Sequence, residues 1–200
     1  MFRMLLFAAA AAVVAIASSD IESNVSLIRA GKLQEATANL RAELENSPDS
    51  PRGHELLGVA LLMQNKLDDA ESHLDKAMEL TPDSASVHVS QGRLAIERKQ
   101  FDKAETALNK AAEIDAETKE LDLYRGSLSL ARKNYGKAVE LLSRFAADNP
   151  DEAYGHYYLG LAQYASKRPD KTIEQFQRFL ELAPKAPEAA RVESLLRSLR

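Results

Sequence analysis

Cysteine is absent from the 200-residue sequence. The fold therefore contains no disulfide, and a redox-active cysteine or a thiolate metal site is excluded. Neither sign of charge dominates, because the formal net charge at pH 7 is only −4. So mild an acidic balance argues against nucleic acid or an anionic membrane as a partner. A charged fraction of 28% beside a hydrophobic fraction of 45% is typical of a folded helical protein.

Motifs of the common catalytic centres are also missing. The sequence contains no Gly-x-Gly-x-x-Gly, no phosphate-binding loop, no His-Glu-x-x-His and no nucleophile elbow. Because no cluster of titratable groups offers a general acid or base, we expect a protein that is not an enzyme and that uses no cofactor.

Long hydrophobic runs are lacking outside the amino terminus. There, Met4 to Ala17 is uninterrupted apolar sequence, and it ends in Ala15-Ile16-Ala17, the small-x-small pattern of a signal-peptidase site. The run is short for a helix of roughly 20 residues that crosses a bilayer core. We predict a signal peptide over residues 1–17, cleaved between Ala17 and Ser18, with a periplasmic or secreted mature protein and no stable membrane insertion after cleavage. An uncleaved N-terminal anchor stays open as the alternative.

What the sequence does contain is a strict period of 34 residues. Glycine, alanine and proline each recur in this period, at Gly58, Gly92, Gly126 and Gly160, at Ala36, Ala70, Ala104 and Ala138, and at Pro48, Pro82, Pro150 and Pro184. A period of this length marks an array of helical repeats. The units run over residues 17–50, 51–84, 85–118, 119–152 and 153–186.

Each unit is expected to hold two helices. In the second unit, apolar residues at helical spacing predict helices over residues 54–64 and 67–80, joined by a tight turn at Asn65-Lys66. The periodic glycines are expected where the two helices pass closest, and the large residues Leu40, Leu74, Leu108, Leu142 and Phe176 are expected to fill the space between repeats. Residues 187–200 are predicted to form a capping helix, with Pro187 in its first turn.

These columns resemble the tetratricopeptide repeat in its Leu-Gly…Ala…Leu-x-x-Ala…Pro form. The match is carried by Leu57-Gly58, Ala70, Leu74, Ala77 and Pro82, and again by Leu159-Gly160, Phe176 and Pro184. The resemblance covers about residues 19–186. It implies an all-α fold, a right-handed α-solenoid of about five helix-turn-helix repeats over residues 18–186, followed by the capping helix at 187–200.

Three of the four histidines fall in one column of the repeat, at His54, His88 and His156, with Asp122 in the fourth unit. Neighbouring helices pack about 8–10 Å apart, so one ion with bonds of about 2 Å would not gather side chains from successive units. We therefore interpret the column as packing residues and expect no metal site.

The surface expected to bind a partner is the face made by the first helices. In related arrays this concave face holds an extended or helical segment, and the family register places in it Arg52, Val59, Leu62, Met63, Val89, Arg93, Ile96, Leu123, Leu130, Tyr154, Tyr157, Leu161 and Tyr164. Aromatic clusters with hydroxyl tips are typical of interface hot spots. Tyr154 is expected at the groove edge, where it contributes least to the core. Glu55 and Val59 replace the Lys and Asn of the family's carboxylate clamp, so acidic C-terminal tails are expected to bind poorly.

The sequence thus predicts a non-enzymatic protein–protein interaction scaffold, exported to the periplasm or cell envelope, that binds a protein or peptide segment in its groove and does not bind nucleic acid. The alternative is a membrane-tethered adaptor of the same family with an uncleaved N-terminal anchor. Oligomeric state is left open by the sequence.

Overall fold

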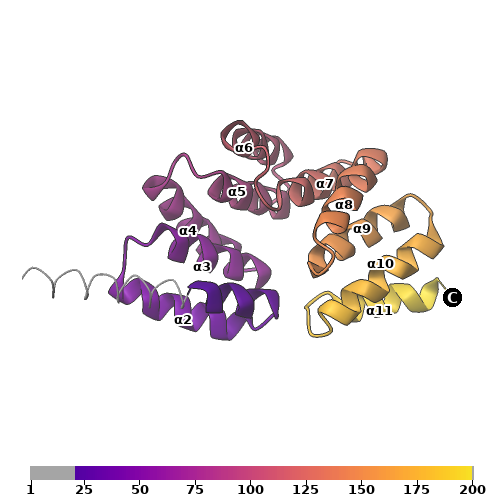
Figure 1. Cartoon of the computed structure of the whole chain (residues 1–200), viewed down its shortest axis with the longest axis horizontal. Coiled ribbons are helices and arrows are strands. Elements are labelled where there is room, and N and C mark those ends of the chain that lie inside the picture. The colour runs from indigo at the N-terminus through magenta and orange to yellow at the C-terminus, as the bar shows by residue number, and fades with distance from the viewer. Residues whose placement is uncertain (1–20, 200) are drawn as a thin grey trace, which may run out of the picture. The chain divides into compact units, whose positions relative to one another are not determined.

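Helices make up all the regular structure that the computed structural model of the chain describes, which covers residues 21–199. The first helix includes residues 21–29. It is followed by α2 (Leu33–Asn46), α3 (Pro51–Met63), α4 (Leu67–Leu80), α5 (Ala85–Glu97), α6 (Phe101–Ile114), α7 (Leu121–Ala131), α8 (Tyr135–Asp148), α9 (Ala153–Ala165), α10 (Pro169–Leu182) and α11 (Ala189–Ser198) (Figure 1). The predicted signal peptide and its cleavage site lie outside the described residues. Within the described range, no helix has the length and apolar character needed to cross a membrane.

The helix boundaries follow local signals in the sequence. The second helices α4 and α10 begin at Leu67 and Pro169, and proline at the first helical position is tolerated because its missing N–H would have no partner there. The first helix of the second repeat begins at Pro51 and not at the predicted residue 54. Ser50 explains the difference, because its hydroxyl accepts a hydrogen bond from the Gly53 N–H at 3.1 Å and so caps the helix.

The turn inside each helix pair has one residue in the left-handed conformation. This residue recurs with the same 34-residue period, at Gly31, Asn65, Lys99, Lys133 and Lys167, with φ between 59° and 70°. Glycine and asparagine adopt this conformation readily, whereas lysine does so at a cost. Gly31 and Asn65 indicate this left-handed position in the sequence. The three lysines at the later positions do not, because lysine is not typical of this conformation.

The chain divides into two compact units, one ending at Leu80 and one beginning at Thr81. In the first unit, α3 packs against α2 and α4. In the second unit the pairs are α5 with α6, α7 with α8, and α9 with α10. Successive pairs meet through α6 with α7 and α8 with α9, and the first helices α5, α7 and α9 also contact one another in order. The second unit therefore presents one face built from three adjacent first helices.

The glycine column lies where helices approach most closely, as predicted. A Cβ added at Gly126 would stand 2.6 Å from Leu142 Cγ, and one at Gly160 would stand 2.5 Å from the Phe176 ring. Real Cβ atoms do not approach so closely, so these positions admit glycine alone without rearrangement. The large residues thus pack over the glycine of their own repeat, and Leu108 and Leu142 also belong to one core cluster that includes residues of three successive repeats.

The carboxyl-terminal helix covers the end of the last repeat. Val192 and Leu196 of α11 are buried in one cluster with Phe176 and Phe179 of α10. The helix begins at Ala189, so Pro187 lies in the preceding turn and not in the first helical turn. A capping role for residues 187–200 agrees with this packing.

Candidate partner-binding face

The three histidines of the column tie their helix pairs to the turn before each of them. In each case the ring Nε2–H donates a hydrogen bond to the carbonyl of the proline six residues earlier: His54 to Pro48 at 2.9 Å, His88 to Pro82 at 2.9 Å, and His156 to Pro150 at 3.0 Å. The carbonyl only accepts, so the ring must be the donor. The histidines are thus more than packing residues, and the constant six-residue spacing between the two columns is the signal in the sequence. Among residues 21–199 no group of three or more His, Asp or Glu is arranged to hold a metal ion.

His54 also faces a second histidine. Its Nδ1 lies 3.0 Å from Nδ1 of His73 on α4. Because Nε2–H of His54 is directed at a carbonyl, neutral His54 accepts at Nδ1 and His73 donates. Burial lowers the pKa of His73, and the neighbouring His54 and Arg41 lower it further, while Asp69 opposes them. A second proton on this pair would place two N–H groups face to face.

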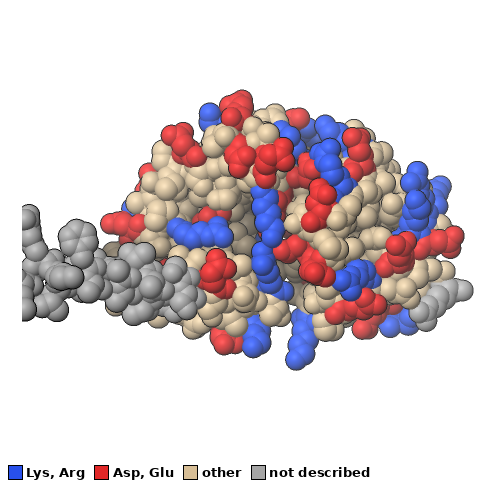
Figure 2. Space-filling model, viewed as in Figure 1, with Lys and Arg blue, Asp and Glu red and all other residues tan. Residues whose placement is uncertain are grey.

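Ion pairs join neighbouring helices on the outer side of the second unit. Arg132 forms ion pairs with both Glu105 and Asp102, each at 2.7 Å. Arg144 pairs with Asp122, the residue that replaces histidine in the fourth repeat. These groups are largely exposed, so water screens each pair and its contribution to stability is small. On the face shown in Figure 2, acidic and basic side chains are interspersed and form no patch of one sign.

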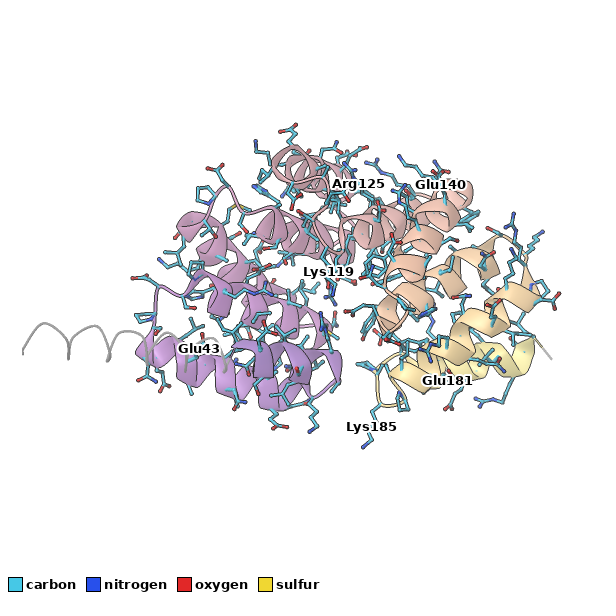
Figure 3. All side chains as sticks on the ribbon, in the orientation of Figure 1. Glu43, Lys119, Arg125, Glu140, Glu181 and Lys185 are labelled. Atoms are coloured by element: carbon cyan, nitrogen blue, oxygen red, sulfur yellow. The ribbon has the colours of Figure 1, made fainter. Side chains whose placement is uncertain are left out.

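Arg125 and Glu140 lie on the two helices of one pair. They lie on α7 and α8 respectively (Figure 3). The guanidinium of Arg125 donates to the side-chain oxygen of Asn109 on α6 at 3.1 Å, which joins two successive pairs. Glu140 is exposed, so a substitution at this position can serve as a control for substitutions on the predicted partner-binding face.

In the first unit, the predicted partner-binding residues lie on α3. Arg52 is exposed, but its guanidinium is held by Glu55 at 2.7 Å, one turn along the same helix. Leu62 is buried, and Val59 and Met63 are partly buried. The charge of Arg52 is therefore already compensated within its own helix.

In the second unit, the predicted residues differ in how accessible they are. Val89, Leu123 and Tyr157 are buried and support the core. Ile96, Leu130 and Leu161 are partly buried, and Tyr164 at the end of α9 is 44% exposed. Tyr164 is the only large hydrophobic side chain in the described range that is exposed to this degree. Ile96, Leu130 and Tyr164 follow one another at the 34-residue period on α5, α7 and α9, and these helices contact one another in order.

Arg93 on α5 is the charged member of this face. Its guanidinium carbon lies 5.5 Å from the ring centroid of Tyr124 on α7, a cation–π geometry. The arginine is partly buried, and its Nε is shielded from solvent with no hydrogen-bond partner among the described residues. Tyr124 was not among the predicted residues, although Tyr158 follows it by one period of 34 residues and could have indicated it.

The tyrosines near Arg93 do not neutralise its charge. Burial raises the pKa of Tyr158 to about 12, and it raises the pKa of Tyr124 well above its ordinary value, although Arg93 opposes both shifts. Both hydroxyls therefore keep their protons at neutral pH. They can donate hydrogen bonds at this face, but they carry no negative charge.

Tyr154 does not stand at an open groove edge. Its hydroxyl donates to Glu188 Oε2 at 3.0 Å, and its ring packs 6.0 Å, centroid to centroid, from Phe179. It also makes ring contacts with Tyr157 and Tyr158. Tyr154 is therefore part of the packing that holds the C-terminal helix, which corrects the expectation that it contributes little to the core. Tyr164 is the better probe of the surface.

Comparison with known proteins gives matches over nearly the whole chain. The family model described as tetratricopeptide repeat matches residues 25–85, 64–119, 89–148 and 123–187. Among solved structures, TTC0263 from Thermus thermophilus, described as a thermophilic TPR protein, is similar at 19% identity and a TM-score of 0.71, over 91% of this chain and 97% of that one.

Two further solved structures are similar in fold. PilF of Pseudomonas aeruginosa has 18% identity and a TM-score of 0.57, over 91% of this chain and 86% of its own. YrrB, described as a TPR protein with an unusual peptide-binding site, has 16% identity and a TM-score of 0.50, over 88% and 90% of the two chains. No curated protein sequence matches the chain at a significant level.

Proposed function

Because the chain belongs to the tetratricopeptide repeat family, whose members generally act as non-catalytic scaffolds that bind protein or peptide partners, we propose that it binds a segment of another protein. We place the binding on the first-helix face of the second unit, defined as the accessible residues of α5, α7 and α9: Arg93, Ile96, Leu130, Tyr158, Leu161 and Tyr164.

The observation that carries this proposal is the exposure of Tyr164 beside the partly buried Leu161 and Leu130. An exposed aromatic ring next to apolar neighbours loses contact with water when a partner covers it, and such rings often dominate interface energies. These residues lie on α7 and α9, two first helices that contact each other. YrrB is similar in fold alone, and its peptide-binding site supports the same class of partner.

Export is the second part of the proposal, and it rests on the sequence of Met4 to Ala17. We propose a periplasmic or cell-envelope scaffold whose mature chain begins at Ser18, with a membrane-tethered adaptor as the alternative. Intact mass of the protein from the envelope fraction distinguishes them. A mass that starts at Ser18 supports export and cleavage, a mass that includes Met1 in the membrane fraction supports the tether, and full-length protein in the cytoplasm contradicts both.

Binding is tested by capturing partners on the immobilised chain and repeating the capture with two single variants. Tyr164→Ala removes the exposed ring, and at a hot spot this costs about 2 kcal/mol, or roughly 30-fold in affinity. Glu140→Ala, on the outer side of α8, is the matched control. Captured proteins that are lost with Tyr164→Ala and kept with Glu140→Ala support the proposal. The reverse pattern would place the working surface on the second helices.

A further inference from the structure

Two columns of the repeat change to lysine in the second unit. In the first unit, the left-handed position of the turn is Gly31 and Asn65, and the third position of the second helix is Glu35 and Asp69. In the second unit all six equivalent positions are lysine, which we call the basic edge: Lys99, Lys133 and Lys167 in the turns, and Lys103, Lys137 and Lys171 in the helices.

Both changes are unfavourable for the fold. A lysine in the left-handed conformation is strained, whereas glycine and asparagine adopt this conformation readily. A cation in the first turn of a helix opposes the positive end of the helix dipole, whereas Glu35 and Asp69 complement it. Proteins break such local rules mainly where function requires it. The lysines therefore indicate a function for the positive charge itself.

The side chains of the basic edge are available for binding. All six lysines are exposed, and none forms an ion pair within 4 Å with a residue between positions 21 and 199. Arg132 binds Asp102 and Glu105, the two carboxylates in the first turns of α6. In the last turn, Arg168 and Asp170 add one charge of each sign. Because the formal net charge of the chain is −4, the basic edge is a local concentration of positive charge on an acidic protein.

The six lysines follow one another along one edge of the second unit. The first helices α5, α7 and α9 contact one another in order, so the turns that follow them are also neighbours. At a helix spacing of about 8–10 Å, three successive turns span about 20 Å. These turns lie at the ends of the helices, so the basic edge borders the first-helix face of the second unit and is distinct from it.

We propose that the basic edge binds an anionic lipid surface. Clusters of roughly four to eight cations on a protein surface are typical of attraction to negatively charged lipids. A flat surface of mobile charges suits a row of flexible lysines that no neighbour holds in place, whereas a fixed carboxylate or phosphate site is usually built from oriented arginine. Nucleic acid suits the edge less, because single strands bind in grooves lined by stacking aromatic rings.

The amino-terminal sequence supports the same choice of partner. The apolar run from Met4 to Ala17 brings the chain to a membrane, whether it acts as a signal peptide or as a tether. Net charge alone argues against an anionic membrane, but attraction to a surface depends on the charges along the edge that meets it. The proposal is independent of the peptide binding proposed above.

Vesicle sedimentation tests the proposal with the full chain. Vesicles of phosphatidylcholine are compared with vesicles that also contain phosphatidylglycerol, at low and at physiological salt. The apolar run at the amino terminus is present in every variant and meets both kinds of vesicle, so the difference between them reports the effect of charge. The chain should bind the anionic vesicles more tightly, and added salt should reduce the difference, because salt screens exposed charges.

Two variants of equal charge show whether the basic edge is responsible. The edge variant carries Lys133→Gln, Lys137→Gln, Lys167→Gln and Lys171→Gln. The control variant carries Lys76→Gln, Lys110→Gln, Lys119→Gln and Lys185→Gln, which lie outside the edge. Each cation near an anionic surface changes partition about five-fold, so the edge variant should bind anionic vesicles weaker by about 100-fold or more, and the control by less than about 10-fold.

Melting temperature separates a binding role from a structural one. The edge variant should melt at the same temperature or higher, because it removes two cations from the first turns of α8 and α10. A clear fall would show that the lysines stabilise the fold and would overturn the proposal. Equal loss of vesicle binding in both variants would overturn it too, because binding would then follow net charge alone. Binding to polyglutamate or to single-stranded DNA, without binding to anionic vesicles, would assign the edge to an acidic protein or a nucleic acid instead.

Discussion

The same substitution at two glycines of neighbouring helices should change stability in opposite directions. Gly126 on α7 belongs to the periodic column, and an added Cβ would stand 2.6 Å from Leu142 Cγ and 2.9 Å from Leu142 Cδ2. Gly136 on α8 lies outside the column, and an added Cβ would meet no atom within 4 Å. Both residues are helical, Gly126 in the interior of α7 and Gly136 in the first turn of α8, so replacing glycine by alanine improves helix propensity at both sites.

The expected magnitudes follow from these contacts. Leu142 is fully buried and its Cγ is close to the backbone, so Gly126→Ala forces the two helices apart at a cost of about 2–3 kcal/mol. Better helix propensity returns up to about 1 kcal/mol, which leaves a net loss of about 1–2 kcal/mol. Gly136→Ala receives the propensity gain alone and should stabilise the chain by about 0.5–1 kcal/mol.

Urea unfolding followed by far-UV circular dichroism measures both changes. The unfolding midpoint should fall for Gly126→Ala and rise for Gly136→Ala, with the slope of free energy against urea unchanged in both. Equal shifts in the same direction at both positions would refute the reasoning. The glycine column would then not mark the closest helix contact, and the repeat register would be wrong.

Three further outcomes are expected. Lys133→Gly relieves a left-handed lysine and should stabilise the chain by about 0.5–1 kcal/mol in thermal melts, whereas Lys137→Gly, inside α8, should destabilise it by about as much. Burial and His54 lower the pKa of His73, so the folded chain binds fewer protons than the unfolded chain below about pH 6.5; stability should be full above that pH and decrease as pH falls. His73→Gln should flatten this dependence, and an unchanged pH profile of the melting temperature would contradict the assignment. Deleting residues 187–200 uncovers Phe179 and should cause self-association in sedimentation experiments; a monomer with unchanged melting temperature would speak against capping.

Much of the fold was predictable because the period repeats one local design. Leu67 begins a second helix where predicted, because hydrophobic spacing and turn residues act within a few positions along the chain. The close approach at Gly58 was predictable for the same reason: a small residue in strict period indicates a contact that every unit makes. Family membership follows from these columns and agrees with the matched repeats.

The candidate face was less predictable, because its side chains contact residues of neighbouring repeats. Tyr154 occupies a position that the register assigns to the groove, yet Glu188, one period later, binds its hydroxyl. Arg52 and Arg93 look alike in the sequence, but one is paired with Glu55 and the other lies against Tyr124. Which neighbour a side chain meets depends on the residues that adjacent helices place opposite it, and the period leaves those free to vary.

By itself, the sequence determined that this protein is an array of helix pairs, because a 34-residue period in glycine, alanine and proline specifies each pair through short-range packing and turn chemistry. The tertiary structure decided the rest. It made Tyr154 part of the packing beneath the C-terminal helix, exposed Tyr164 and set the Arg93 guanidinium over the Tyr124 ring, since burial and pairing depend on helices that come together only when the chain folds.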